Sequence, residues 1–227
     1  MGQWKGDAII FDLDGVLIDA NSVYERHWQV WAERNQVPFE DILAVHHGRP
    51  AAGTVAIVAP HLNPHHEAAE YNRSLLADTD QSGVLGYPGA VELIGSLAAD
   101  RWAIATSAPR RVAVARLGHL ELPQPDVLVG ADDVDQGKPD PDPYLLAARG
   151  LGYEPQQCLV VEDAPAGIEA AAAAGTFVVA VATTHPDHAL EQADAIVARL
   201  SDLTVRADAT GLTVEWTTTQ TAQPPIL

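Results

Sequence analysis

Apolar residues along this chain fall in short unbroken runs, and each run ends in a polar or acidic residue. Continuous apolar runs are typical of strands covered on both faces, as in a parallel sheet, whereas half-exposed strands alternate. Five runs predict such strands, at residues 7–12, 102–107, 126–130, 158–163 and 177–184.

Segments with helical spacing separate these runs, at residues 88–100, 140–152 and 164–175. Pro88 suits a first helical turn, and Asp142 suits an N-cap. Gly150 and Gly175 suit helix ends. Strands that alternate with helices predict the α/β class, with a Rossmann-like three-layer α/β/α core around a parallel sheet.

The stretch after the first predicted strand breaks this alternation. Residues 21–86 read as helices with no convincing strand. We therefore predict a core domain of residues 1–18 and 87–203, with a helical cap domain inserted at residues 19–86. Residues 204–227 are threonine-rich and end in prolines, which predicts a weakly ordered tail or at most an added edge strand.

The net charge of −18 excludes several function classes. Nucleic acids and anionic membranes carry the same sign, so we expect neither as a partner. Cys158 is the only cysteine, and it lies in an apolar run, which indicates a core thiol and fits a reducing compartment. The chain shows neither a signal-peptide pattern nor a bilayer-spanning stretch, so we expect a soluble cytoplasmic protein. We separately expect a monomer or weak homodimer.

Candidate chemistry gathers at the predicted carboxyl ends of the strands, where open parallel sheets bind ligands. Asp12 and Asp14 follow the first strand, and Gly15 lets the chain turn away. A carboxylate is ionised at pH 7 and can attack phosphorus, which makes Asp12 the candidate nucleophile. Asp14 can serve as general acid and then as general base, if its surroundings raise its pKa.

An anionic nucleophile and an anionic phosphate need positive charge between them, so we predict Mg²⁺ as cofactor. The predicted ligands are Asp12, the main-chain carbonyl of Asp14, Asp163 and, through water, Glu162. The predicted phosphate-binding residues are Thr106, Ser107 and Lys138.

Four motifs in order, FDLDGVLID, IATS, QGKPDPDPYL and VVEDAPAGIEAAAAAG, resemble those of the haloacid dehalogenase superfamily. The resemblance spans residues 7–203. It implies that Asp12 is the nucleophile, Asp14 the general acid/base and Asp163 a metal ligand, with Thr106 and Lys138 anchoring phosphate. The insertion resembles the cap of the first subclass, and the closest resemblance is to sugar- and polyol-phosphate phosphatases. A small phosphate monoester is therefore the expected substrate.

Three other functions compete with this one. A sugar phosphomutase of the β-phosphoglucomutase kind would share the core and the cap. Such mutases resemble this chain in the first motif, but they carry a histidine ten residues after the general acid, and this chain does not. Tyr24 stands there instead. Dehalogenases lack the second aspartate of the first motif, and Asp14 is present. A non-catalytic metabolite-binding protein would be expected to have lost an acidic residue or the lysine.

Within the predicted cap, Arg49 lies where related caps present residues to substrate, and we name it as a candidate substrate-binding residue. Trp28 and Trp31 are expected in the cap core rather than as a sugar-stacking platform. The histidines lack zinc-ligand spacing with cysteine, so we assign no metal to them. They are His46, His47, His61, His65 and His66.

Overall fold

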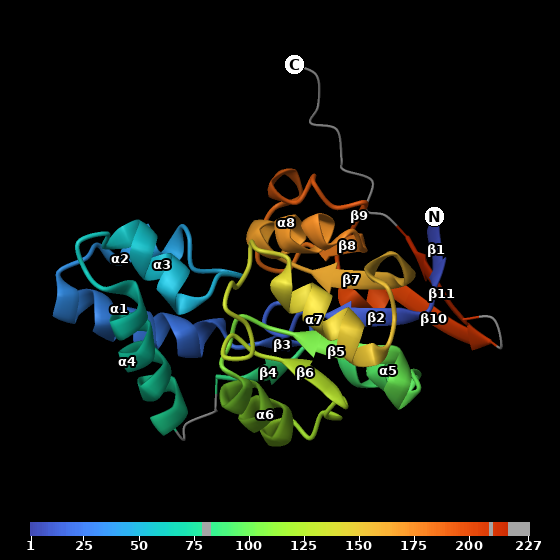
Figure 1. The fold of residues 1–227 in the computed structure, drawn as a ribbon, viewed down its shortest axis with the longest axis horizontal. Helices are drawn as coiled ribbons and strands as arrows, with labels where there is room; N and C mark the ends of the chain where they lie inside the picture. Colours follow the sequence, from blue (N-terminus) through green and yellow to red (C-terminus); the bar gives the residue numbers. More distant parts are fainter. Residues whose placement is uncertain (79–82, 209–210, 218–227) are drawn as a thin grey trace, which may run out of the picture.

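The computed structural model describes residues 1–78, 83–208 and 211–217. Its centre is a six-stranded parallel sheet (Figure 1). In spatial order the strands are β6 (Val127–Val129), β5 (Trp102–Ala105), β2 (Ala8–Phe11), β7 (Cys158–Glu162), β8 (Phe177–Val181) and β9 (Ala195–Val197). All five predicted strands are present. The sixth, β9, was not predicted.

Helices cover both faces of this sheet. They are α5 (Ala90–Gly95), α6 (Arg110–His119), α7 (Asp142–Leu151) and α8 (Pro165–Ala174). Along β2, Ala8 and Ile10 face the apolar cluster that includes α7 and α8, whereas Ile9 and Phe11 face the cluster that includes α5 and α6. A strand buried on both sides needs apolar residues at every position, which explains the unbroken run. The predicted three-layer α/β/α core is confirmed.

The helix ends differ in detail from the prediction. Asp142 is the first helical residue of α7 rather than its N-cap, which is Pro141. The helix continues through Gly150 and ends before Gly152, which adopts φ 81°. Gly175 ends α8 at φ 83°, as predicted. Gly150 stays helical because packing of the helix against the sheet outweighs the cost of about 1 kcal/mol for an interior glycine.

The C-terminal segment is more ordered than the sequence suggested. Strands β10 (Leu203–Asp208) and β11 (Gly211–Trp216) form an antiparallel sheet with β1 (Gly2–Gly6), in the order β1-β11-β10. The expectation of a weakly ordered tail is therefore wrong for these strands, and β11 is central rather than an edge. The ring of Trp216 lies 5.8 Å from that of Phe177, which ties this sheet to the core. Residues 218–227 lie outside the described residues.

The segment after β2 leaves the core and returns beside its point of departure. Short strands β3 (Ile18–Asp19) and β4 (Leu85–Gly86) pair antiparallel. Between them the helices are α1 (Asn21–Asn35), α2 (Phe39–Leu43), α3 (Ala51–Val58) and α4 (Pro64–Ala77). These helices lie together at one side of the core (Figure 1). The boundaries of a separate cap domain stay a prediction.

Aromatic residues form the centre of this helical segment. The ring of Trp28 stacks on Tyr71 at 4.0 Å and meets Trp31 edge-on at 5.5 Å. Both tryptophans are buried, as expected for a helical core.

No helix within the described residues is long and apolar enough to cross a bilayer. The described residues also include the 3-10 turns η1 (Ala99–Arg101), η2 (Pro155–Gln157), η3 (Asp187–Ala189) and η4 (Leu200–Asp202).

Candidate active site

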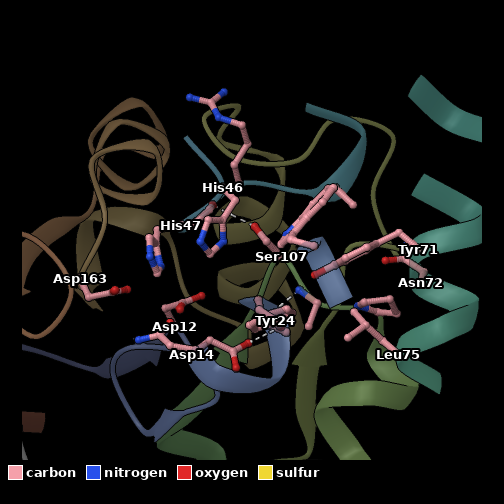
Figure 2. Close-up of a pocket in the computed structure, with 18 residues that line it drawn as sticks. Asp12, Asp14, Tyr24, His46, His47, Tyr71, Asn72, Leu75, Ser107 and Asp163 are labelled. Carbon is pink, nitrogen blue, oxygen red and sulfur yellow. Dashed lines mark hydrogen bonds between the residues drawn. The ribbon is translucent and has the colours of Figure 1, made fainter. Parts of the chain in front are cut away.

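A cavity opens at the carboxyl ends of β2, β5 and β7, under the helices α1 and α4. Figure 2 shows Asp12 and Asp14 on one side of this cavity, with Asp163 beside Asp12 and with Tyr71 and Asn72 across from them. The three aspartates come from two neighbouring strands that pair in parallel, so the sheet register brings them together. This is the edge at which the sequence predicted the site.

Lys138 binds two carboxylates, one of which, Asp12, lines the cavity. Its ammonium group donates to Asp12 Oδ1 at 2.5 Å and to Glu162 Oε1 at 2.7 Å. All three side chains are buried. Burial acts against the ammonium form, but the two carboxylates outweigh it and raise the pKa of Lys138. Lys138 therefore carries a fixed positive charge at the base of the site.

Glu162 is fully occupied by protein donors. Its Oε1 also accepts from the Tyr144 hydroxyl at 2.9 Å, and its Oε2 accepts from the backbone N–H groups of Asp163 and Ala164 at 2.7 and 2.9 Å. Although burial acts in the opposite direction, Lys138 and these hydrogen bonds lower the pKa of Glu162. This geometry argues against the predicted contact of Glu162 with a metal, because no lone pair is left for a metal-bound water. Its contacts make Glu162 a support for Lys138 and for the backbone at Asp163.

Asp163 faces the cavity with one oxygen free. Its Oδ2 accepts from the Thr184 hydroxyl, while Oδ1 is buried and has no hydrogen-bond partner among the described residues. Gly15 adopts φ 91°, and a Cβ atom there would lie 2.1 Å from Asp163 Oδ2. Only glycine therefore lets the turn after Asp14 approach Asp163 this closely.

The carboxylates at this edge outnumber their cations. Burial raises the pKa of Asp12 to about 7; Lys138 opposes this shift and Glu162 adds to it. Burial, together with Glu162 and Asp12, also raises the pKa of Asp163. Lys138 pairs with Asp12 and Glu162 but not with Asp163, whose Oδ1 finds no partner among the described residues, so positive charge is missing at that oxygen. That deficit and the oxygen donors fit a hard divalent cation.

Across residues 1–78, 83–208 and 211–217, no three His, Cys, Asp or Glu side chains gather closely enough to form a metal site by themselves. A site built from Asp12, Asp163 and a main-chain carbonyl needs only two such side chains. Mg²⁺ commonly takes one or two carboxylates and keeps several waters, so this smaller donor set is compatible with it.

Asp14 is held by two residues that the sequence did not reveal as site residues. Its Oδ1 accepts from Arg116 Nη1 at 2.7 Å, and its Oδ2 accepts from the Tyr24 hydroxyl at 2.9 Å. Arg116 also donates to the Tyr24 oxygen at 2.6 Å. Both Asp14 oxygens are therefore fixed, and the side chain lines the cavity beside Asp12.

Thr106 and Ser107 line the cavity opposite the first motif. The Thr106 Oγ1 accepts from the N–H of Ala108 at 3.1 Å, which leaves its hydroxyl proton available to an acceptor in the cavity. The Ser107 hydroxyl instead donates to the carbonyl of Gly48 at 3.0 Å. Ser107 therefore links the core to the loop before α3, and its predicted phosphate contact would require this bond to break.

The helical segment contributes the outer wall of the cavity. Arg49 lines it, as do His46 and His47, whose rings lie 4.0 Å apart. The His46 Nε2, Arg49 Nε and Tyr71 Oη atoms are buried and find no protein partner in the described part of the chain. Burial, with His47 adding to it, lowers the pKa of His46 to about 3, so this imidazole is neutral at pH 7. These atoms can hydrogen-bond a bound ligand or water.

Sequence reasoning missed Arg116, Tyr24 and Tyr144. Arg116 carried a signal, since it falls on the buried face of α6 with Val112 and Leu117, where an apolar residue is expected. An arginine at such a position calls for a buried partner. Tyr24 carried a positional signal, since it stands where mutases carry a histidine, but its bond to Asp14 could not be read from that position. Tyr144 carried no comparable signal, because tyrosine is common in helices that pack on a core.

Comparisons with known proteins agree with this geometry. A family model described as haloacid dehalogenase-like hydrolase matches residues 7–175. The chain is 40% identical over 205 residues to hexitol phosphatase A of Escherichia coli, covering 89% of this chain and 95% of that protein. It is 39% identical over 204 residues to validoxylamine A 7'-phosphate phosphatase of Streptomyces hygroscopicus, covering 86% and 94%.

Among solved structures, β-phosphoglucomutase from Clostridium difficile superposes with a TM-score of 0.73 at 24% identity, covering 87% of this chain and 93% of that one. At this identity the likeness concerns the fold. The motif residues meet at one sheet edge, the family model covers most of the core, and both relatives align over nearly their full length. The chain therefore belongs to the haloacid dehalogenase-like hydrolases.

Proposed function

We propose that this protein is a Mg²⁺-dependent phosphatase that hydrolyses small sugar or polyol phosphates through an aspartyl-phosphate on Asp12. One observation carries the proposal: Asp12 opens onto the cavity while its Oδ1 binds the fixed Lys138 ammonium at 2.5 Å. That arrangement supplies a nucleophile and a positive charge at one point, and Asp14 adds a proton carrier beside them.

In the first step, the free Asp12 oxygen attacks phosphorus as the bond from phosphorus to the ester oxygen breaks. The departing oxygen takes a proton from Asp14. In the second step, water attacks the phosphorus of the aspartyl-phosphate and gives its proton to Asp14, which restores the Asp12 carboxylate and releases phosphate. Lys138 and Thr106 stabilise the phosphoryl oxygens. Bound Mg²⁺, held by Asp12, Asp163 and the carbonyl of Asp14, would neutralise the remaining charge.

The substrate class is supported by the outer wall of the cavity. Arg49, His46 and Tyr71 present buried polar atoms that find no protein partner in the described chain. A ligand rich in hydroxyl groups would satisfy them, whereas an apolar ester would leave them desolvated at about 1–3 kcal/mol each. Hexitol phosphatase A, a similar protein, is named for a substrate of this kind.

A sugar phosphomutase is the second candidate, and the shared fold favours keeping it. Tyr24 argues against it, because this residue stands where mutases carry a histidine and its hydroxyl is bonded to Asp14. A non-catalytic binding protein is disfavoured, since Asp12, Asp14, Lys138 and Asp163 are all present and Lys138 binds Asp12.

The test is phosphate release from a panel of sugar, polyol, nucleotide and amino-acid phosphates with Mg²⁺. Asp12→Asn should lower turnover by a factor on the order of 10³ or more, because it removes the nucleophile. Asp100→Asn, an exposed residue of η1, is the matched control and should keep full activity. Ca²⁺ should inhibit, since its larger and looser coordination can occupy both Asp12 oxygens. Undiminished activity in Asp12→Asn, or in excess chelator, would refute the mechanism.

A further inference from the structure

The burial of the charged Arg116 side chain costs free energy and needs an explanation. This residue is 1% exposed on α6, among apolar side chains. A buried guanidinium costs several kcal/mol in desolvation unless it is paired, and an apolar residue of similar volume is often as stable or more so. Core packing alone therefore does not account for an arginine here. Its guanidinium donates to Asp14, the candidate acid/base, and to the Tyr24 hydroxyl beside it.

The three side chains form a closed network. Arg116 Nη1 reaches Asp14 Oδ1 and the Tyr24 hydroxyl, which itself donates to Asp14 Oδ2. The guanidinium carbon also lies 4.3 Å from the centre of the Tyr24 ring, so the ring supports the cation from its face. With both oxygens held by different donors, the Asp14 carboxylate cannot rotate freely. Figure 2 shows Asp14 and Tyr24 joined in this way beside Asp12.

The network also spans two parts of the fold. Tyr24 lies on α1, within the helical insertion, whereas Arg116 lies on α6 and Asp14 follows β2 of the core. A movement of α1 away from the core would withdraw the Tyr24 hydroxyl from Asp14 Oδ2. The orientation of Asp14 is thus tied to the position of the helices that cover the cavity.

Resting on the phosphatase function proposed above, we propose that Arg116 and Tyr24 are positioning residues that orient Asp14 for proton transfer. Their hydrogen bonds in the described part of the chain run to Asp14 and to each other and not to Asp12, so we expect them to act through Asp14. Misplacing a proton-transfer group by about 1 Å costs on the order of 10²-fold in rate. Arg116→Lys and Tyr24→Phe should therefore lower kcat by about 10–100-fold and leave KM within about threefold.

p-Nitrophenyl phosphate gives a readout that a merely structural defect would not produce. Its leaving group departs without a proton, so phosphorylation of Asp12 does not need Asp14, whereas hydrolysis of the aspartyl-phosphate still does. In both variants we expect a burst of p-nitrophenol close to one equivalent per site, followed by a slow steady rate. With an alkyl phosphate, both steps need Asp14 and no burst should appear.

Matched controls keep the Arg116 and Tyr24 substitutions interpretable. Arg111→Lys changes an exposed arginine on the same helix, and Tyr153→Phe removes a hydroxyl from another ring that faces an arginine. Both should behave as the unmodified protein does. If Arg116→Lys is unfolded at the assay temperature, Tyr24→Phe, which keeps the ring, decides the question alone.

The proposal is overturned if both folded variants keep more than half of the normal kcat, or if burst and steady rate fall together. Failure of the phosphatase function is a distinct result, because the unmodified protein would then release no p-nitrophenol that depends on Asp12.

Discussion

Substituting glutamine for Glu162 tests whether this residue is a structural support or a metal ligand. Glu162 accepts four hydrogen bonds, from the Lys138 ammonium, the Tyr144 hydroxyl and the backbone N–H groups of Asp163 and Ala164. Glutamine has the same shape but only one acceptor oxygen, and its NH₂ group donates. Whichever way the amide lies, two buried donors face another donor.

The size of the effect follows from these contacts. Two unsatisfied buried groups cost about 1–3 kcal/mol each. Breaking a buried ion pair costs about 3–5 kcal/mol, and here Lys138 keeps its bond to Asp12, which limits that loss. We therefore expect Glu162→Gln to lower the free energy of unfolding by about 3–5 kcal/mol. For a chain of 227 residues, this corresponds to a fall in Tm of about 6–20 °C.

The assay pairs thermal unfolding with a Mg²⁺ titration of activity. Glu169→Gln, an exposed residue of α8, is the control and should shift Tm by less than about 1–2 °C, because exposed substitutions cost within about 0.5 kcal/mol. Glu162→Gln should lower Tm as stated and leave the half-saturating Mg²⁺ concentration within about threefold, whereas Asp163→Asn should raise it at least about tenfold. A Glu162→Gln protein with unchanged Tm and a tenfold greater Mg²⁺ requirement would refute the structural assignment.

Three further outcomes are expected. Gly15→Ala should lower both kcat and Tm, since its Cβ would meet Asp163 Oδ2 at 2.1 Å with φ at 91°; normal kinetics would contradict the close approach. Lowering the pH below 6.5 should make His46 destabilise the fold by up to about 1.4 kcal/mol per pH unit, because unfolded His46 binds a proton that the folded form, with a pKa of about 3, excludes. The raised pKa values of Asp12 and Asp163 act in the opposite direction, so the measurement is the difference between the protein and its His46→Gln variant. Urea unfolding at pH 7, 6 and 5 should show that the variant gains free energy of unfolding relative to the protein as the pH falls; a constant difference would contradict the reasoning. Ending the chain after residue 202 should lower Tm strongly, because it removes β10 and β11. The buried Leu, Val and Trp side chains of these strands each stabilise the fold by roughly 1.5–3 kcal/mol. An unchanged Tm would mean that this sheet does not stabilise the core.

The sequence predicted the core well because its signals are local. A strand buried on both faces must be apolar throughout, and a helix must repeat with its own period, so β2 and α8 could be read from neighbouring residues. Helix ends were less predictable. Gly150 continues α7, because packing against the sheet decides which of two nearby glycines terminates it.

The C-terminal strands show how a local signal can be overlooked. Residues 212–216 alternate between buried and half-buried positions, which is the pattern of a strand, but threonine-rich and proline-rich surroundings hid it. Their pairing with β1 joins segments separated by almost the entire chain. Nothing in either segment alone specifies the other as its partner.

The sequence by itself determined which residues are candidates for the chemistry: Asp12, Asp14, Lys138 and Asp163 stand in motifs whose order places them at one edge of a parallel sheet. Only the tertiary structure decided how their charges are shared. Glu162 and Asp163 are neighbours in sequence, yet one is saturated by protein donors and the other keeps an unpartnered oxygen. Likewise, Arg116 meets Asp14 across 102 residues. Burial and hydrogen-bond partners are properties of the packed fold, and they decide which carboxylate is saturated by protein donors and which keeps an oxygen available for a ligand.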